Sequence, residues 1–201
     1  MFYYLEGTVA MIAQNLAVID IGGVGYACMM TTHTQSHLEI GKKARLYSYC
    51  HIKEDAFDIF GFFDISEKRC FELLISVSGV GPKAALSILS SITPESLALA
   101  IIGDDETALT VAPGIGKKLA QRIILELKDK VSKEQAALKA SGFVQPRGDG
   151  GLTGSKQREA AAALAVLGYS QSEISGAMRG INIEALSVEE IIREVLKNSV
   201  K

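Results

Sequence analysis

The sequence predicts an α+β protein of several domains, with a small β-barrel at the N-terminus, a central all-α region and a helical bundle at the C-terminus. Residues 1–63 contain short runs of β-branched and aromatic residues separated by turn signals, and helical periodicity begins at Asp64. A Gly-rich stretch, "GFVQPRGDGGLTGSK" at 142–156, has no apolar periodicity and predicts a flexible linker. The expected domains are therefore 1–63, 64–141 and 157–201.

The N-terminal domain contains five candidate strands. They are "YYLEGTVAMIA", "LAVIDI", "YACMM", "ARLYSYCHI" and "FDIFGFF". The glycines of "GGVG" at 22–25 follow the second run and indicate a tight hairpin. Five short strands with a Gly-rich hairpin favour an OB-like barrel.

The central region contains several helix signals. The run at 64–77 is helical, and "TPES" offers Thr93 as an N-cap with Pro94 at the first helical position. "KKLAQRIILELKDKV" is strongly amphipathic and predicts a helix that ends near Val131.

The C-terminal segment has three short helical patterns, and two of them begin with a capping box. Ser170 pairs with Glu173, and Ser187 pairs with Glu190. A bundle of this size has a marginal core, so a tethered docking module is its simplest use. The apolar stripe of this segment is mostly core, and any exposed part of it is the expected partner-docking surface: Leu164, Leu167, Ile191, Ile192 and Val195.

Two Gly-rich turns form an internal repeat in the central region. "SGVGPKAA" at 78–85 is followed 35 residues later by "PGIGKKLA" at 113–120. Each turn lies between two apolar-periodic segments, which predicts helix, hairpin and helix in both copies. The matching positions, with the neighbouring cations, are the candidate DNA-binding residues: Gly79, Val80, Gly81, Lys83, Gly114, Ile115, Gly116, Lys117, Lys118 and Arg122.

The residue types in these turns suit phosphate. Glycine permits positive φ and close approach of another backbone, and the following helix presents free N–H groups and the positive end of its dipole. The lysines add charge, and the hydrophobe between the glycines anchors the turn. Two equivalent hairpins suit the two strands of a duplex across a minor groove, in contacts that do not read sequence.

Other ligand and catalytic motifs fit poorly. A Walker A loop requires glycine where Val111 stands, and the dinucleotide fingerprint at Gly79 follows a helical segment instead of a strand. The histidines at 33, 37 and 51 lack metal-ligand spacing, and no catalytic constellation is present. We therefore expect no nucleotide, metal or other cofactor, and no enzymatic activity in this chain.

Composition bears on the compartment. No apolar run is long enough for a membrane span, and the N-terminus does not resemble a signal peptide. The three cysteines form no CxxC pair, which suggests buried thiols in a reducing cytoplasm. The net charge of -2 is unusual for a nucleic-acid-binding protein, so a binding surface must concentrate its charge locally.

The paired turns, together with "IDIGGVGY" at 19–26, "IKEDAFDIFGF" at 52–62 and "EAAAALAVLGYSQSE" at 159–173, resemble the RuvA family. The resemblance covers essentially the whole chain in the same order. It implies an OB-like barrel, a double helix-hairpin-helix domain and a mobile three-helix, UBA-like domain. It also implies that Glu54 and Asp55 form an acidic pin.

The resemblance further implies a function in recombination, DNA repair and the SOS response. RuvA binds Holliday junctions as a four-fold tetramer, sometimes two face to face, and holds the junction open. The hexameric ATPase RuvB docks on its C-terminal domain and moves the DNA, and the resolvase RuvC cuts the junction.

Other interpretations fit the same residues. Glu54 and Asp55 also fit an ordinary solvated turn, and helix-hairpin-helix domains also occur in nucleases and glycosylases. The tight acidic cluster of Asp104, Asp105 and Glu106, which a nuclease would need for metal, looks instead like a helix N-terminus. A protein-interaction adaptor that binds no DNA is the third possibility.

Overall fold

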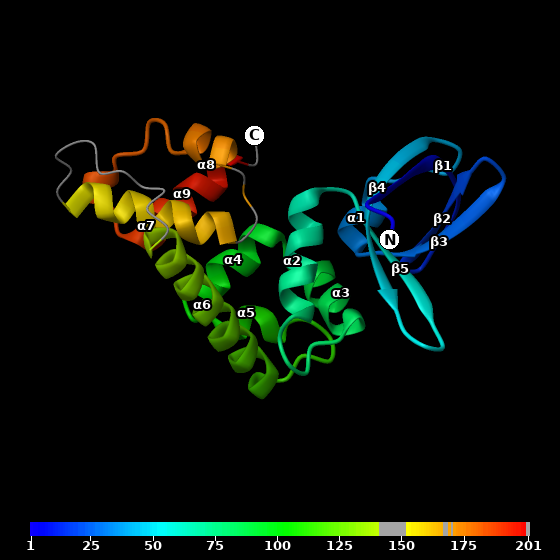
Figure 1. The fold of residues 1–201 in the computed structure, drawn as a ribbon, viewed down its shortest axis with the longest axis horizontal. Coiled ribbons are helices and arrows are strands. Elements are labelled where there is room, and N and C mark those ends of the chain that lie inside the picture. The colour runs from blue at the N-terminus through cyan, green and yellow to red at the C-terminus, as the bar shows by residue number, and fades with distance from the viewer. Residues whose placement is uncertain (141–151, 167–168, 170, 200–201) are drawn as a thin grey trace. The chain divides into compact units, whose positions relative to one another are not determined.

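The computed structural model describes residues 1–140, 152–166, 169 and 171–199 (Figure 1). The chain forms two compact units. One comprises Met1–Thr93 with Ala112–Gly114, and the other comprises Pro94–Val111 with Ile115–Lys201. The barrel therefore shares a unit with the first central helices, and the domain boundaries expected from sequence stay predictions.

The first unit contains the expected barrel. Its strands are β1 (Tyr4–Ala13), β2 (Leu16–Ile21), β3 (Val24–Met29), β4 (Lys43–Ile52) and β5 (Phe57–Phe62). They close in the order β1-β2-β3-β5-β4, with β4 paired to β1. Only β3 and β5 pair in parallel, and the other pairs are antiparallel. All five strands expected from sequence are confirmed, and so is the OB-like barrel.

Alternation along the strands builds the barrel core. Inward-facing side chains such as Val9, Ile19 and Leu46 are fully buried. Gly22 and Gly23 have φ of 64° and 90°, as the tight β2–β3 turn requires. The sequence did not predict α1 (Thr32–Ser36), a single short helix between β3 and β4 that Thr31 caps.

Helices α2 (Ile65–Ile75) and α3 (Pro82–Ser91) complete the first unit. Asp64 caps α2 by accepting the Glu67 N–H at 2.7 Å. The ring of Phe71 lies 5.1 Å from that of Phe60 and 4.9 Å from that of Phe62, so α2 packs directly on β5.

The second unit is helical. Its elements are α4 (Pro94–Ile102), α5 (Glu106–Thr110), α6 (Lys117–Ala140), α7 (Leu152–Val166), α8 (Gln171–Ala177), the 3₁₀ turn η1 (Ile183–Ala185) and α9 (Val188–Ser199). Helix α4 begins at Pro94, as predicted. Asp105 caps α5 through the N–H groups of Thr107 and Ala108, which confirms that the acidic cluster marks a helix start.

Two helix boundaries differ from the sequence prediction. Helix α6 continues past Val131 to Ala140, because "SKEQAALKA" consists mainly of good helix formers without glycine or proline. Helix α7 begins at Leu152, inside the predicted linker, because no proline stops the helical run from extending toward the N-terminus. Residues 142–151 of that linker lie outside the described residues.

The C-terminal helices form the expected small bundle. The capping box at α9 is confirmed, since Ser187 N–H donates to Glu190 and Glu190 N–H donates to the Ser187 hydroxyl, at 2.8 and 3.2 Å. Ser170 of the other capping box is outside the described residues. Within the part of the chain that the structure describes, no single helix is long and apolar enough to cross a membrane, and one bent pair, α3 with α4, passes by length and composition only.

Candidate nucleic-acid interface

The first Gly-rich turn joins α2 to α3. Gly79 has a φ of +88°, a conformation that side chains disfavour, so this position requires glycine. Val80 is buried and its N–H donates to the Val77 carbonyl, which anchors the turn from inside. Gly81 is the N-cap of α3 and lacks a side-chain cap, so the first N–H groups of α3 stay available to an external acceptor.

The second turn repeats this geometry residue by residue. Gly114 has a φ of +84°, Ile115 is buried, and Gly116 stands directly before α6. The Gly116 carbonyl accepts the Ala120 N–H at 3.0 Å, as the Gly81 carbonyl accepts the Ala85 N–H at 3.0 Å. The repeat seen in the sequence is therefore a repeat of backbone structure.

The last glycine of each turn is explained by neither strain nor internal packing. Gly81 and Gly116 do not have positive φ, and a Cβ added at either one would meet no heavy atom within 4 Å. The protein's own fold would accept a small side chain at both positions. What glycine provides there is an exposed, uncovered helix N-terminus that an anion can approach closely.

The four candidate cations differ in their surroundings. Lys83 and Lys118 occupy equivalent repeat positions, both are exposed, and among the described residues the structure records no carboxylate within ion-pair distance of either. Lys117, which matches Pro82 in the first turn, lies 2.9 Å from Glu106. Of the four candidate cations, Lys83 and Lys118 are therefore the two without a recorded carboxylate partner among the described residues.

Arg122 is also engaged within its own helix. Its Nε donates to Glu126 at 2.8 Å, one turn along α6. The pKa of Glu106 is held below its usual range by the hydrogen bond from Lys117 and by a second one from Gln121, so Glu106 is a stable negative charge. Sequence spacing alone did not reveal that these two cations have internal partners.

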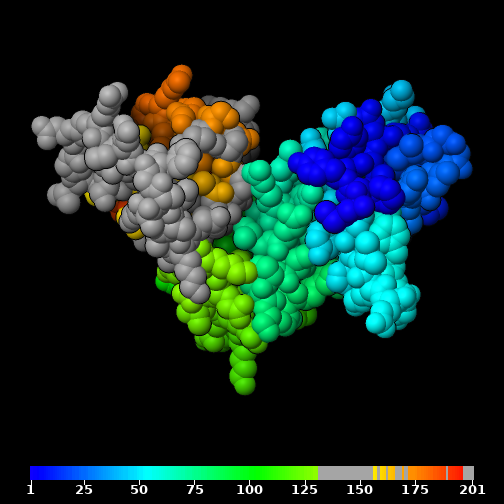
Figure 2. All heavy atoms as spheres, viewed as in Figure 1, coloured from blue at the N-terminus to red at the C-terminus, as the bar shows by residue number. Residues whose placement is uncertain are grey.

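The predicted pin residues lie at the tip of the β4–β5 hairpin. Lys53 N–H donates to the Ala56 carbonyl at 2.8 Å, which closes a tight turn with Glu54 and Asp55 at its end. Both carboxylates are exposed. In Figures 1 and 2 this hairpin projects beyond the rest of the barrel, so its charges are presented away from the barrel body.

A buried carboxylate that sequence analysis missed ties α1 to α2. Glu67 accepts hydrogen bonds from the hydroxyls of Thr31 and, at 2.6 Å, Thr34. Burial raises the pKa of Glu67, and the two hydroxyl bonds oppose that rise. His33 and Asp64 offer ligand atoms near Glu67, all within 4.8 Å of one another, although the threonines already hold the Glu67 oxygens. Sequence spacing gave no signal for this grouping, since His33 lies more than 30 residues before Asp64 and Glu67.

The described residues of the expected partner-docking stripe lie in the bundle core. Leu164, Ile191, Ile192 and Val195 are each no more than 1% exposed. These four side chains are buried in the core and offer no surface to a partner. Helical periodicity marked them as candidates because it does not separate core positions from contact positions. Leu167 is outside the described residues.

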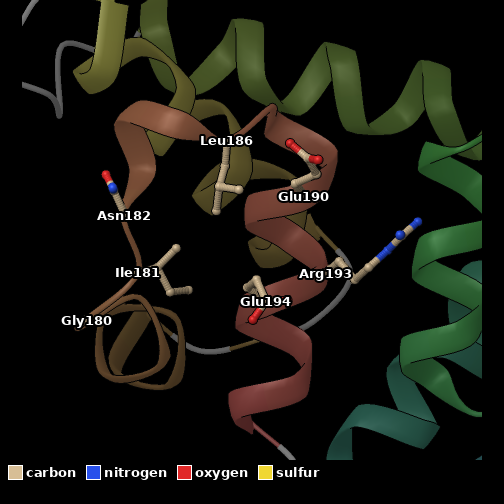
Figure 3. Close-up of a pocket in the computed structure, with 7 residues that line it drawn as sticks. All are labelled: Gly180, Ile181, Asn182, Leu186, Glu190, Arg193 and Glu194. Atoms are coloured by element: carbon tan, nitrogen blue, oxygen red, sulfur yellow. The ribbon is translucent and has the colours of Figure 1, made fainter.

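The bundle has a cleft of about 460 Å³ beside α9, between that helix and the segment from Gly180 to Leu186. Figure 3 shows Ile181 and Leu186 pointing toward this space while Arg193 extends away from it. Glu190 and Glu194 give the α9 side of the cleft a negative rim.

Comparison with known proteins covers all of these regions. Sequence models match the RuvA N terminal domain at residues 1–61, the SAM-like helix-hairpin-helix tandem at 71–129 and the RuvA C-terminal domain at 155–200. The chain is 44% identical over 201 residues to a protein of Acetivibrio thermocellus, covering 98% of each chain. The chain belongs to the RuvA family.

Other RuvA proteins are similar to this chain over their full length. Identity is 44% over 202 residues with a protein of Caldanaerobacter subterraneus subsp. tengcongensis, covering 100% of both chains. It is 39% over 199 residues with one of Ruminiclostridium cellulolyticum, covering 98% of this chain and 100% of the relative. All three relatives are named Holliday junction branch migration complex subunit RuvA. The family predicted from the sequence motifs is confirmed.

Proposed function

We propose that this protein binds four-way DNA junctions, without cutting them, as the RuvA subunit of a branch migration complex. The observation that carries the proposal is the structural identity of the two turns, each with a glycine at φ near +85°, an open helix N-terminus and an exposed lysine at the same position. Such paired sites suit phosphates of a DNA backbone and leave base sequence unread. Membership of the RuvA family supports the choice of a four-way junction as the target.

The acidic pin supplies the selectivity in this proposal. In a four-fold tetramer, four copies of Glu54 and Asp55 would surround the point where strands exchange. Negative charges there repel phosphates and disfavour a continuous duplex across the surface, so they select a junction by repulsion. Two tetramers face to face would enclose the junction, and one tetramer would leave a face open to a resolvase of the RuvC type.

The motor docks on the C-terminal bundle in this proposal. The cleft beside α9 suits an apolar side chain of the partner, which would contact Ile181 and Leu186. A basic residue next to it in the partner would face Glu190 and Glu194. We assign this cleft, in place of the buried stripe, as the docking site for a hexameric ATPase of the RuvB type. Ile181→Ser should abolish stimulation of the motor ATPase and leave DNA binding unchanged, with Val24→Ser on the barrel as the exposed control.

A gel-shift comparison tests the DNA-binding proposal. A four-way junction and a linear duplex of the same sequences are titrated at one fixed salt concentration, with and without magnesium. We expect a clear preference for the junction and intact DNA strands under both conditions. Equal affinities would contradict the junction-binding proposal, and magnesium-dependent cleavage would indicate a nuclease.

A further inference from the structure

The β4–β5 hairpin carries two large apolar side chains in solvent, directly beneath the acidic turn. Ile52 is 67% exposed and Phe57 is 54% exposed. They are opposite partners in the antiparallel pairing, so their side chains stand together on one face of the hairpin. The Lys53–Ala56 hydrogen bond places Glu54 and Asp55 immediately beyond them.

This exposed pair continues a row that is buried further along the same strands. Cys50 and Ile59 are the next opposite pair on that face, and each is only 7% exposed. The row thus leaves the barrel interior and continues along the β4–β5 hairpin, which projects from the barrel in Figure 1. Phe57 makes a ring contact with Phe2 at 6.1 Å and still has more than half of its surface in solvent. Two adjacent apolar side chains at a hairpin tip form a small exposed patch that an external partner can cover.

The charges around the pair decide which part of a nucleic acid can reach it. Residues 53–58 carry three carboxylates and one ammonium. A phosphate is repelled from this tip, whereas the face of a base is uncharged and apolar. Apolar side chains that enter DNA do so against base steps, which they partly unstack.

We infer that Ile52 and Phe57 contact the faces of the bases next to the strand exchange point of an opened four-way junction. This inference rests on the proposed junction binding and on the pin lying at the junction centre. The pin keeps the backbones apart, and the apolar pair beneath it binds the base faces that opening leaves without a stacking partner. The β4–β5 hairpin then repels phosphates at its acidic tip and binds base faces through the apolar pair beside that tip.

A thermodynamic cycle tests the contact. Affinity is measured for two synthetic junctions, one with normal bases and one with abasic nucleotides at the positions flanking the exchange point. We expect the wild-type protein to bind the abasic junction about fivefold or more weakly, since base–side chain stacking is lost. The double variant Ile52→Thr with Phe57→Thr should bind both junctions alike, because its threonines keep the strand but remove the apolar contact.

The controls separate the possible failures. Val24→Thr with Ile40→Thr removes two apolar side chains of similar exposure elsewhere on the barrel and should behave as wild type. Ile52→Thr alone leaves the Phe57–Phe2 contact intact and should give part of the effect even if the double variant folds poorly. If the wild type shows no junction preference, the proposed function fails and this inference fails with it.

Two results would overturn the inference alone. The first is an abasic penalty that is the same in the wild type and the double variant while both still prefer the junction. The second is a double variant that loses its oligomeric state by light scattering, since Ile52 and Phe57 would then be a contact between copies of the chain.

Discussion

The ammonium of Lys117 lies 2.9 Å from the carboxylate of Glu106, so one of the two adjacent lysines at the start of α6 has a counterion within the protein. Lys118 next to it occupies the repeat position of Lys83, and no ion pair is recorded for it among the described residues. Within one hairpin, a lysine with a carboxylate partner therefore stands beside a lysine for which none is recorded.

Removing the internal counterion should strengthen DNA binding. Glu106→Gln leaves Lys117 without its carboxylate, so affinity for both junction and duplex should rise and the salt dependence should steepen by about one unit. The measurement is a series of affinities at increasing salt. Glu39→Gln, an exposed carboxylate on the barrel, is the matched control. An unchanged salt slope for Glu106→Gln would show that Lys117 does not contact phosphate.

Loss of the repeat lysines should weaken binding in a graded way. Lys83→Ala and Lys118→Ala should each reduce the salt slope by about one unit, and the double variant by about two. The loss should be equal for junctions of different sequence, because phosphate contacts carry no sequence information. Arg179→Ala, an exposed cation of the C-terminal bundle, should leave the slope as it was.

The last glycine of each turn should separate binding from stability. In Gly81→Ser and Gly116→Ser the new Cβ meets nothing within 4 Å, and serine is itself a good N-cap. The free energy of unfolding should therefore stay within about 0.5 kcal/mol of the wild-type value. Junction affinity should fall, because the side chain stands where an anion approaches the helix N-terminus.

The first glycine of the turn provides the contrast. Gly114→Ser forces a side chain into a φ of +84° and should cost about 1–2 kcal/mol of stability as well as affinity. Chemical unfolding and gel shift on the same preparations measure both effects. If Gly116→Ser binds as tightly as the wild type, the turn does not hold a phosphate.

The pin prediction concerns selectivity. Glu54→Gln with Asp55→Asn removes both charges from an exposed turn, so the fold should be unchanged. Affinity for duplex should rise more than affinity for junction, because repulsion at the hairpin tip is relieved. The ratio of the two affinities and the rate of motor-driven branch migration are the quantities to compare. If neither changes, the two carboxylates are a solvated turn.

Glu67 should make stability fall as pH rises. Burial raises its pKa in the folded protein above the ordinary value of 4.5, so ionisation is harder in the folded state than in the unfolded state. The contribution of protonated Glu67 to the free energy of unfolding is fully present below pH 4.5, and it is lost as pH rises through the folded-state pKa. Glu67→Gln does not titrate and should gain stability relative to the wild type over that window. Denaturant unfolding between pH 4 and 8 measures this, and a parallel pH dependence of the two proteins would contradict it.

Local patterns in the sequence determined the five strands, most helix starts and the two hairpins. Gly79 and Gly114 could be identified because a positive φ is required of one residue and favours glycine there. Val80 and Ile115 could be identified because an apolar residue within a turn is usually buried against its neighbours. The capping pair of Ser187 and Glu190 is likewise a matter of residues three apart. Interactions between residues only a few positions apart can be predicted from the sequence alone.

Only the tertiary structure decided which side chains are buried and which are already paired within the protein. It pairs Lys117 with Glu106 and Glu67 with two threonines more than 30 residues away, and it buries Ile191 and Ile192 in the bundle core. It also exposes Ile52 and Phe57 at the end of a row that is otherwise buried. Periodicity gives the face on which a residue lies but not what covers that face, because burial and ion pairing depend on segments that are distant in sequence.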